Sequence, residues 1–168
     1  MNKCIFLDRD GVLNVDNVNY VWTPETFEIL PGVPEALKIL KERGYYLVIV
    51  TNQSGIAKGI YTKEDVLNCH WYLQQQTGNL IDELYFSPYH SSQTASLASK
   101  PGTLSFEKAI ARYNIDIHQS WMVGDMERDL IPAKKIGLKT ILIPHRIPDS
   151  DFADFKVDSL LEACNYIS

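Results

Sequence analysis

The chain has 168 residues, of which 45% are hydrophobic, 16 are basic and 21 are acidic, so its formal net charge is −5 at pH 7. This length suits one domain with its own core, and we predict a single domain over residues 1–168. The acidic balance argues against a nucleic-acid-binding surface, which needs clustered lysine and arginine, but a small phosphate ester remains open.

The sequence has no apolar run of membrane-spanning length, and its first strand begins without the basic lead of a signal peptide. We therefore expect a cytoplasmic protein, monomeric and without a membrane partner. Its three cysteines, Cys4, Cys69 and Cys164, are widely separated and odd in number. That pattern favours reduced, mostly buried thiols over disulfide bridges or a metal cage.

The first predicted element is a buried strand that ends in two carboxylates. The apolar run 4–7 is typical of a strand in a parallel sheet, and it is followed by Asp8, Arg9, Asp10 and Gly11. Ligands of open α/β sheets lie beyond the carboxyl ends of such strands. Because alternate side chains of an extended segment point the same way, we expect Asp8 and Asp10 to face one bound group while Arg9 turns aside. Taken alone, an Asp-x-Asp pair is more often a loop start that caps backbone amides.

Residues 14–24 form a polar, aromatic stretch with no regular period, which is either a packed connection or a substrate flap. An amphipathic helix follows from Val33 and is closed by Gly44. The next buried strand, 45–50, runs into the polar segment 51–55. Hydroxyl and amide donors at such a point can hold phosphate oxygens, although a Thr-Asn turn alone is a weak signal.

A third strand is predicted at 84–86, after a covering helix that begins at Thr62 with Asp65 in an approximate capping box. A Ser/Ala-rich loop, 87–99, then leads to Lys100 and a proline. Because proline favours extended geometry before it, we expect Lys100 to project from a stiff loop, although a lone Lys-Pro is more often a solvated charge.

The fourth predicted strand, 121–123, follows a helix marked by apolar residues between 106 and 113. It ends in a second acidic segment that contains Asp125 and Asp129. Asp129 alone could be a helix-start carboxylate that interacts with the helix dipole. The two acids nevertheless place carboxylates at another strand end.

A short helix ending at Gly137 comes next, and we expect Pro132 in its first turn, where proline is tolerated. The fifth predicted strand covers 140–143. Asp158 is the expected N-cap of a closing helix.

Strands that alternate with helices predict a three-layer, Rossmann-like α/β sandwich with a mostly parallel central sheet. Polar groups at four successive strand ends would then converge on one edge. The candidates are Asp8, Asp10, Thr51, Asn52, Lys100, Asp125 and Asp129. Such a set suits displacement at phosphorus, because carboxylates hold Mg²⁺ while the metal and a lysine neutralise phosphate oxygens.

The chemistry that these residues predict has two steps. Asp8 attacks phosphorus to form an aspartyl-phosphate. Asp10 protonates the leaving alkoxide and then deprotonates the water that hydrolyses the intermediate. The first role requires a protonated Asp10, so we expect nearby carboxylates or desolvation to raise its pKa.

The motifs Asp8-x-Asp10-Gly-Val-Leu, Thr51, Lys100 and Gly124-Asp125-x-x-x-Asp129 together resemble the haloacid dehalogenase (HAD) superfamily of phosphatases. They occur in the family's order and cover most of the chain. The resemblance implies a HAD-like fold, and the helix after the second strand is too short for a large cap domain, so we expect a capless member. The second acid of the first motif is typical of a phosphatase rather than a dehalogenase.

Within the superfamily, the segments 8–16, 31–33 and 51–59 most resemble the phosphatases that act on the 7-phosphate of D-glycero-D-manno-heptose 1,7-bisphosphate, with histidinol-phosphate phosphatases as near relatives. The Mg²⁺ ligands that this resemblance implies are Asp8, Asp125 and the backbone carbonyl of Asp10. The phosphoryl group would be steadied by Thr51 and Lys100, with Asp129 in support. The substrate contacts would come from Asp16, Asn52, Gln53, Ser54 and Ser99.

The sequence departs from this family in its metal loop, in the residue that reads the second phosphate, in a flap near 17–19 that is one residue longer, and in Met126, which replaces a frequent lysine. The four zinc ligands of the family's cysteine-histidine loop are replaced by Ser87, Tyr89, Ser96 and Ala98. His90 alone cannot bind structural zinc, so we predict none. The family's arginine that reads the second phosphate or the anomeric end is Ser99 here, and serine cannot supply a bidentate fork.

Other functions remain open at this stage. A histidinol-phosphate phosphatase would share every catalytic residue. An inactive binding module would have no physical need for costly converging carboxylates. A phosphotransferase or receiver also forms an aspartyl-phosphate, but the second acid suits rapid hydrolysis. We assign no catalytic role to His70, His118 or His145.

Overall fold

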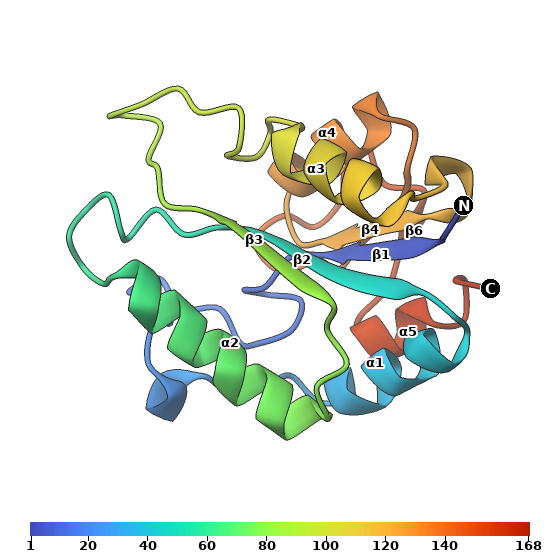
Figure 1. Ribbon diagram of the computed structural model, residues 1–168, viewed down its shortest axis with the longest axis horizontal. Helices are drawn as coiled ribbons and strands as arrows, with labels where there is room; N and C mark the ends of the chain where they lie inside the picture. The colour runs from blue at the N-terminus through green and yellow to red at the C-terminus, as the bar shows by residue number, and fades with distance from the viewer.

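The computed structural model describes residues 1–168 as a three-layer α/β sandwich (Figure 1). At its centre lies a six-stranded sheet in the order β3-β2-β1-β4-β5-β6, with every neighbouring pair parallel. The strands are β1 Cys4–Leu7, β2 Tyr46–Asn52, β3 Glu83–Ser87, β4 Trp121–Gly124, β5 Lys139–Leu142 and β6 Phe155–Lys156. The strand order reverses at β1, and ligands of such sheets bind at this kind of reversal.

The helices lie on both faces of the sheet (Figure 1). One face is covered by α1 (Val33–Glu42), α2 (Lys63–Thr77) and α5 (Leu160–Ala163). The other is covered by α3 (Leu104–Tyr113) and α4 (Glu127–Lys135). Two short 3-10 turns, Pro24–Thr26 and Ile117–Gln119, complete the regular structure. None of the helices combines the length and the apolar character needed to cross a membrane.

The central position of β1 explains why its sequence is apolar throughout, because both faces of this strand are buried. Ile5 and Leu7 belong to the core beneath α1 and α2, whereas Cys4 and Phe6 face the core that contains Phe106 of α3. Alternate side chains of a strand point to opposite faces, so a strand between two helical layers has to be apolar at every position. The three cysteines are free and buried, as predicted.

Helix ends follow local capping chemistry, with one correction. At the start of α2, Thr62 Oγ1 accepts from the N–H of Asp65 while Asp65 accepts from the N–H of Thr62, which is the predicted capping box. The N-cap of α5 is Ser159 rather than Asp158. Ser159 Oγ accepts from the N–H of Glu162 at 3.1 Å.

Two further expectations were wrong. Pro132 lies in the interior of α4, because that helix already begins at Glu127. Its side chain is buried there, so packing outweighs the hydrogen bond that its missing N–H would have made. The strand β6 was also missed, since it has only two residues and both are exposed.

Candidate active site

Lys100 joins three segments of the chain at the carboxyl edge of the sheet. Its side chain is buried, and its Nζ donates to Asp8 Oδ1 at 2.8 Å and to the carbonyl of Val50 at 2.7 Å. The same atom forms an ion pair with Asp129 Oδ1 at 2.5 Å. Lys100 therefore links the ends of β1 and β2 to the start of α4, rather than projecting into solvent.

Three buried carboxylates gather around this lysine. One oxygen each of Asp8, Asp125 and Asp129 lies within 4.8 Å of the other two. Burial, followed by the charge of Asp129, raises the pKa of Asp8, although Lys100 opposes the shift. Burial and the charges of Asp8 and Asp129 raise the pKa of Asp125 to about 9. The cluster thus contains more negative charge than one lysine offsets.

The two downstream acids use their oxygens differently. Asp129 Oδ2 accepts from the N–H groups of Asp125 and Met126, each at 3.1 Å, so this side chain fixes the loop after β4. Asp125 Oδ1 is buried and has no hydrogen-bond partner. Asp125 therefore offers a free carboxylate oxygen, whereas Asp129 is occupied by the loop and by Lys100.

Two glycines make room for these acids. Gly11 has a φ of +87°, and a Cβ on it would lie 2.3 Å from Asp125 Oδ2. A Cβ on Gly124 would lie 2.3 Å from the Cβ of Asp129. Both separations are too short for any other residue. Gly11 therefore lets the end of β1 approach the end of β4, and Gly124 lets α4 pack against the end of β4.

Asp10 is not among the three clustered carboxylates, and Arg9 pairs with it instead of turning aside as expected. Asp10 Oδ1 accepts from Arg9 Nη2 and from Asn14 Nδ2, both at 2.9 Å. The strand β1 ends at Leu7, so the alternation of an extended segment no longer applies at Asp10.

The pKa of Asp10 is lowered, although the sequence predicted that it would be raised. Burial alone would raise it, but the positive charge of Arg9 and hydrogen bonds from Arg9, Asn14 and Gln53 outweigh burial. The pairing with Arg9 was not expected from the sequence, and it reverses the direction of the shift.

Gln53 connects Asp10 to the second strand. Its Nε2 lies 3.0 Å from Asp10 Oδ2 and also 3.0 Å from Thr51 Oγ1. Tyr61, which sequence reasoning missed, reaches the other end of the same amide. A Cβ on Gly55 would lie 2.1 Å from the Tyr61 ring, so glycine allows this close approach.

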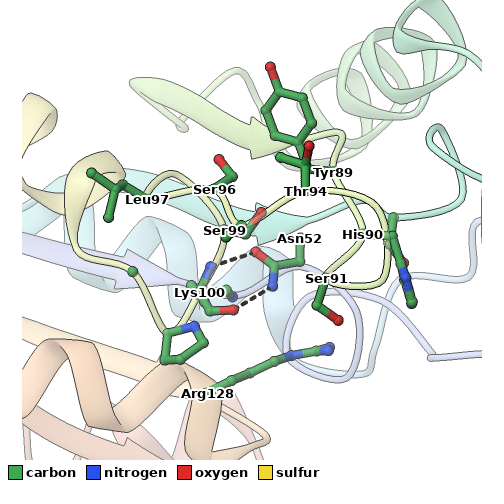
Figure 2. Close-up of a pocket in the computed structure, with 14 residues that line it drawn as sticks. Asn52, Tyr89, His90, Ser91, Thr94, Ser96, Leu97, Ser99, Lys100 and Arg128 are labelled. Carbon is green, nitrogen blue, oxygen red and sulfur yellow. Dashed lines mark hydrogen bonds between the residues drawn. The ribbon is translucent and has the colours of Figure 1, made fainter.

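Asn52 holds the backbone of Lys100 (Figure 2). The N–H of Lys100 donates to Asn52 Oδ1 at 2.9 Å, and Asn52 Nδ2 donates to the Lys100 carbonyl at 3.0 Å. The substrate contact expected for Asn52 stays a prediction, and in this structure its amide positions the lysine loop. Pairing between an amide and a distant backbone segment leaves no signal in sequence.

Two cavities flank this arrangement. The first, of about 600 Å³, lies between Asn52 and the loop after β3, and we call it the loop cavity (Figure 2). The second, of about 240 Å³, is lined by Asp10, Gln53 and residues 16–18 and 20–21 of the loop after β1. Asn52, Ser54 and Arg128 line both cavities. The loop after β1, for which the sequence predicts either a packed connection or a substrate flap, therefore forms one wall of the second cavity.

The remaining predicted contacts are divided between the cavities. Asp16 lines the second cavity, where its Oδ2 pairs with Arg146 Nη2 at 2.6 Å. Ser99 lines the loop cavity, and its hydroxyl is hydrogen-bonded to that of Ser87. Sequence reasoning missed Arg128 and Arg146, because single arginines in a helix or loop form no recognisable motif.

Comparisons with known proteins identify relatives that cover most of this chain. Residues 3–137 match the haloacid dehalogenase-like hydrolase family. The D-glycero-beta-D-manno-heptose-1,7-bisphosphate 7-phosphatase of Haemophilus ducreyi is 36% identical over 99% of this chain and 98% of its own length. The enzyme of the same name from Haemophilus influenzae is 38% identical over 96% of this chain and 95% of its own.

Solved structures extend the comparison. The D,D-heptose 1,7-bisphosphate phosphatase of B. bronchiseptica, crystallised with magnesium and phosphate, superposes with a TM-score of 0.87 at 25% identity. The match covers 98% of this chain and 97% of that protein. The predicted three-layer fold is thereby confirmed.

Proposed function

This chain belongs to the haloacid dehalogenase-like hydrolase family, and we propose that it removes the 7-phosphate of D-glycero-D-manno-heptose 1,7-bisphosphate through an aspartyl-phosphate. The observation that carries the reaction type is the buried cluster of Asp8, Asp125 and Asp129 around Lys100. The relatives that span almost the whole chain act on this sugar bisphosphate by name, which favours it over histidinol phosphate.

Asp8 is the proposed nucleophile. Its Oδ1 is held at 2.8 Å by the Lys100 ammonium, which orients the carboxylate. In the first step a bond forms between a carboxylate oxygen of Asp8 and phosphorus, while the bond from phosphorus to the sugar oxygen breaks. The positive charge of Lys100 would balance the negative charge of the phosphoryl oxygens, and the Thr51 hydroxyl would donate to one of them.

Asp10 is the proposed acid and base. It lies two residues after Asp8 and is held by Arg9, Asn14 and Gln53. As a base it takes a proton from the water that hydrolyses the aspartyl-phosphate, and an ionised carboxylate suits this step. As an acid it must first take up a proton, and the negative charge of an arriving phosphate favours this because it raises the pKa of Asp10.

The residues of the cluster fit Mg²⁺. Asp125 has a buried oxygen without a partner, and the pKa of Asp8 and of Asp125 is raised first by burial and then by neighbouring negative charge, which a hard cation would offset. The backbone carbonyl of Asp10 accepts no backbone hydrogen bond and is available as a third ligand. We propose Asp8, Asp125 and this carbonyl as the ligands, with Asp129 in support. The bound ion would supply positive charge to the phosphoryl oxygens.

The test is release of inorganic phosphate from heptose 1,7-bisphosphate and from histidinol phosphate, with Mg²⁺ and with EDTA. We expect Mg²⁺-dependent turnover, faster on the heptose ester. Asp8→Asn should abolish it, whereas Asp151→Asn, which changes an exposed acid on the surface, should not. Turnover that persists in Asp8→Asn would contradict the proposed mechanism. Faster hydrolysis of histidinol phosphate than of the heptose ester would contradict the proposed substrate. Metal analysis of the purified protein tests the predicted lack of structural zinc.

A further inference from the structure

The loop cavity lacks acidic residues, although the chain contains 21 of them. Hydroxyl groups line it instead, from Ser54, Tyr89, Ser91, Thr94, Ser96 and Ser99. Lys100 is part of its wall, so the cavity adjoins the proposed reaction centre. A space with hydroxyl donors and no carboxylate, in a protein of net charge −5, is suited to a ligand that carries negative charge.

Arg128 is the one guanidinium on this cavity. Figure 2 shows its side chain extended along one side, with the hydroxyl-bearing residues of the loop on the other. Each of the other four arginines is engaged: Arg9 with Asp10, Arg43 with backbone carbonyls, Arg112 with Glu83 and Arg146 with Asp16. Among the five arginines, only the side chain of Arg128 forms no hydrogen bond or ion pair within the chain.

Lys100 cannot serve as the cation of this cavity. Its Nζ is already shared between Asp8, Asp129 and the carbonyl of Val50, and its side chain is buried. Ser99, which stands where the resembling family has its arginine, also lines the cavity but has no charge. A second anionic group that enters this space therefore has Arg128 as its only unengaged lysine or arginine.

We propose that the second, non-reacting phosphate of a sugar bisphosphate binds in the loop cavity against Arg128. The inference rests on the proposed phosphatase function and names the residue that makes the enzyme selective for bisphosphates. The guanidinium approaches from α4, on the side of the cavity opposite Ser99 (Figure 2). It thus supplies the planar, bidentate donor that serine at position 99 cannot provide.

The experiment compares kcat/KM for paired substrates that differ only in the second phosphate. The pairs are heptose 1,7-bisphosphate with heptose 7-phosphate, and fructose 1,6-bisphosphate with fructose 6-phosphate. We expect the wild-type protein to prefer the bisphosphate of each pair, and Arg128→Ala to reduce that preference about tenfold or more, through KM. Arg128→Lys should retain part of the preference, because it keeps the charge but loses the fork.

Two matched arginines serve as controls. Arg112→Ala removes an exposed arginine of α3 that lies on neither cavity, and it should leave the preference at the wild-type value. Arg146→Ala removes the arginine of the second cavity. A larger loss of preference in Arg146→Ala than in Arg128→Ala would place the second phosphate in the other cavity and overturn the inference.

The outcomes separate this inference from the proposed function. If the wild-type protein hydrolyses the esters without preferring the bisphosphates, or if Arg128→Ala keeps the preference, the inference is wrong while the phosphatase function stands. If the wild-type protein hydrolyses no member of either pair, both are wrong.

Discussion

Tyr61 Oη donates a 2.6 Å hydrogen bond to Gln53 Oε1, and this bond determines which way the Gln53 amide faces. With its oxygen engaged, the amide presents its nitrogen to Asp10 and Thr51. Burial raises the pKa of Tyr61 to about 12, so its hydroxyl remains protonated as a donor. A tyrosine outside the carboxylate cluster thus sets the hydrogen bond that Asp10 receives from Gln53.

Tyr61→Phe should therefore slow turnover by acting through Gln53. We expect kcat to fall about fivefold, roughly the 1 kcal/mol of one net hydrogen bond, with little change in KM. The control is Tyr45→Phe, which removes a hydroxyl bonded to the carbonyl of Ser168 at the amino end of β2, whereas the site lies at the carboxyl end of that strand. Steady-state kinetics and thermal melting of both variants separate the two roles. A Tyr61→Phe enzyme that is less stable but has wild-type kcat would show a purely structural tyrosine.

Asn52→Ala should loosen the lysine loop. The variant loses two hydrogen bonds to the backbone of Lys100, at 2.9 and 3.0 Å, so the ammonium is held less firmly against Asp8. We expect kcat/KM to fall about tenfold or more and the protein to lose about 1–3 kcal/mol of stability. Asn165→Ala, at an exposed position whose side chain makes no hydrogen bond, is the matched control. Equal kinetics in the two variants would contradict this role.

Gly11→Ala should disrupt the site through a steric clash. The new Cβ would lie 2.3 Å from Asp125 Oδ2, so the carboxylate has to move. Gly44→Ala is a close control, since its φ of +82° is similar but nothing lies within 4 Å of its Cβ. Both variants should lose about 1 kcal/mol or more from backbone strain.

Only Gly11→Ala should weaken Mg²⁺ binding in calorimetric titration and lower kcat strongly. Similar Mg²⁺ affinity in the two alanine variants would exclude the proposed contribution of Asp125 to the metal site.

Asp154→Asn should change how stability depends on pH. Burial raises the pKa of Asp154, but hydrogen bonds from Lys134 and Thr140 outweigh burial and lower it. A lowered folded-state pKa adds stability at pH values above the unfolded-state pKa of about 3.9. This stability is lost as the pH falls through the folded-state pKa.

The wild-type protein should therefore melt at a higher temperature than Asp154→Asn at pH 7. The gap should narrow below about pH 4, as followed by circular dichroism. A gap that stays constant with pH would point to packing instead of charge. Asp151→Asn should melt like the wild-type protein throughout.

The sequence predicted the layers and the convergence of strand ends because buried parallel strands are continuous apolar runs followed by polar residues. Asp8, Lys100 and Asp125 meet for this reason, although they are distant in sequence. The direction of the Asp10 carboxylate could not be predicted, because the chain has left β1 at that point and a turn decides it.

Contacts that depend on a single side chain were likewise invisible in the sequence. Tyr61, Arg128 and the amide of Asn52 act through geometry that no spacing encodes. The two-residue β6 is too short to show a period. The single domain, the monomeric state and the cytoplasmic location stay predictions.

The position of β1 in the sheet also constrains how the protein can be made. β1 pairs with β2 on one edge and with β4 on the other, and β4 is synthesised long after the first strand. Until Trp121 and its neighbours leave the ribosome, the central strand has a bare apolar edge of the kind that invites aggregation. The nascent chain must therefore complete its fold late in translation. A fragment that stops before β4 should be prone to aggregation and should lack activity.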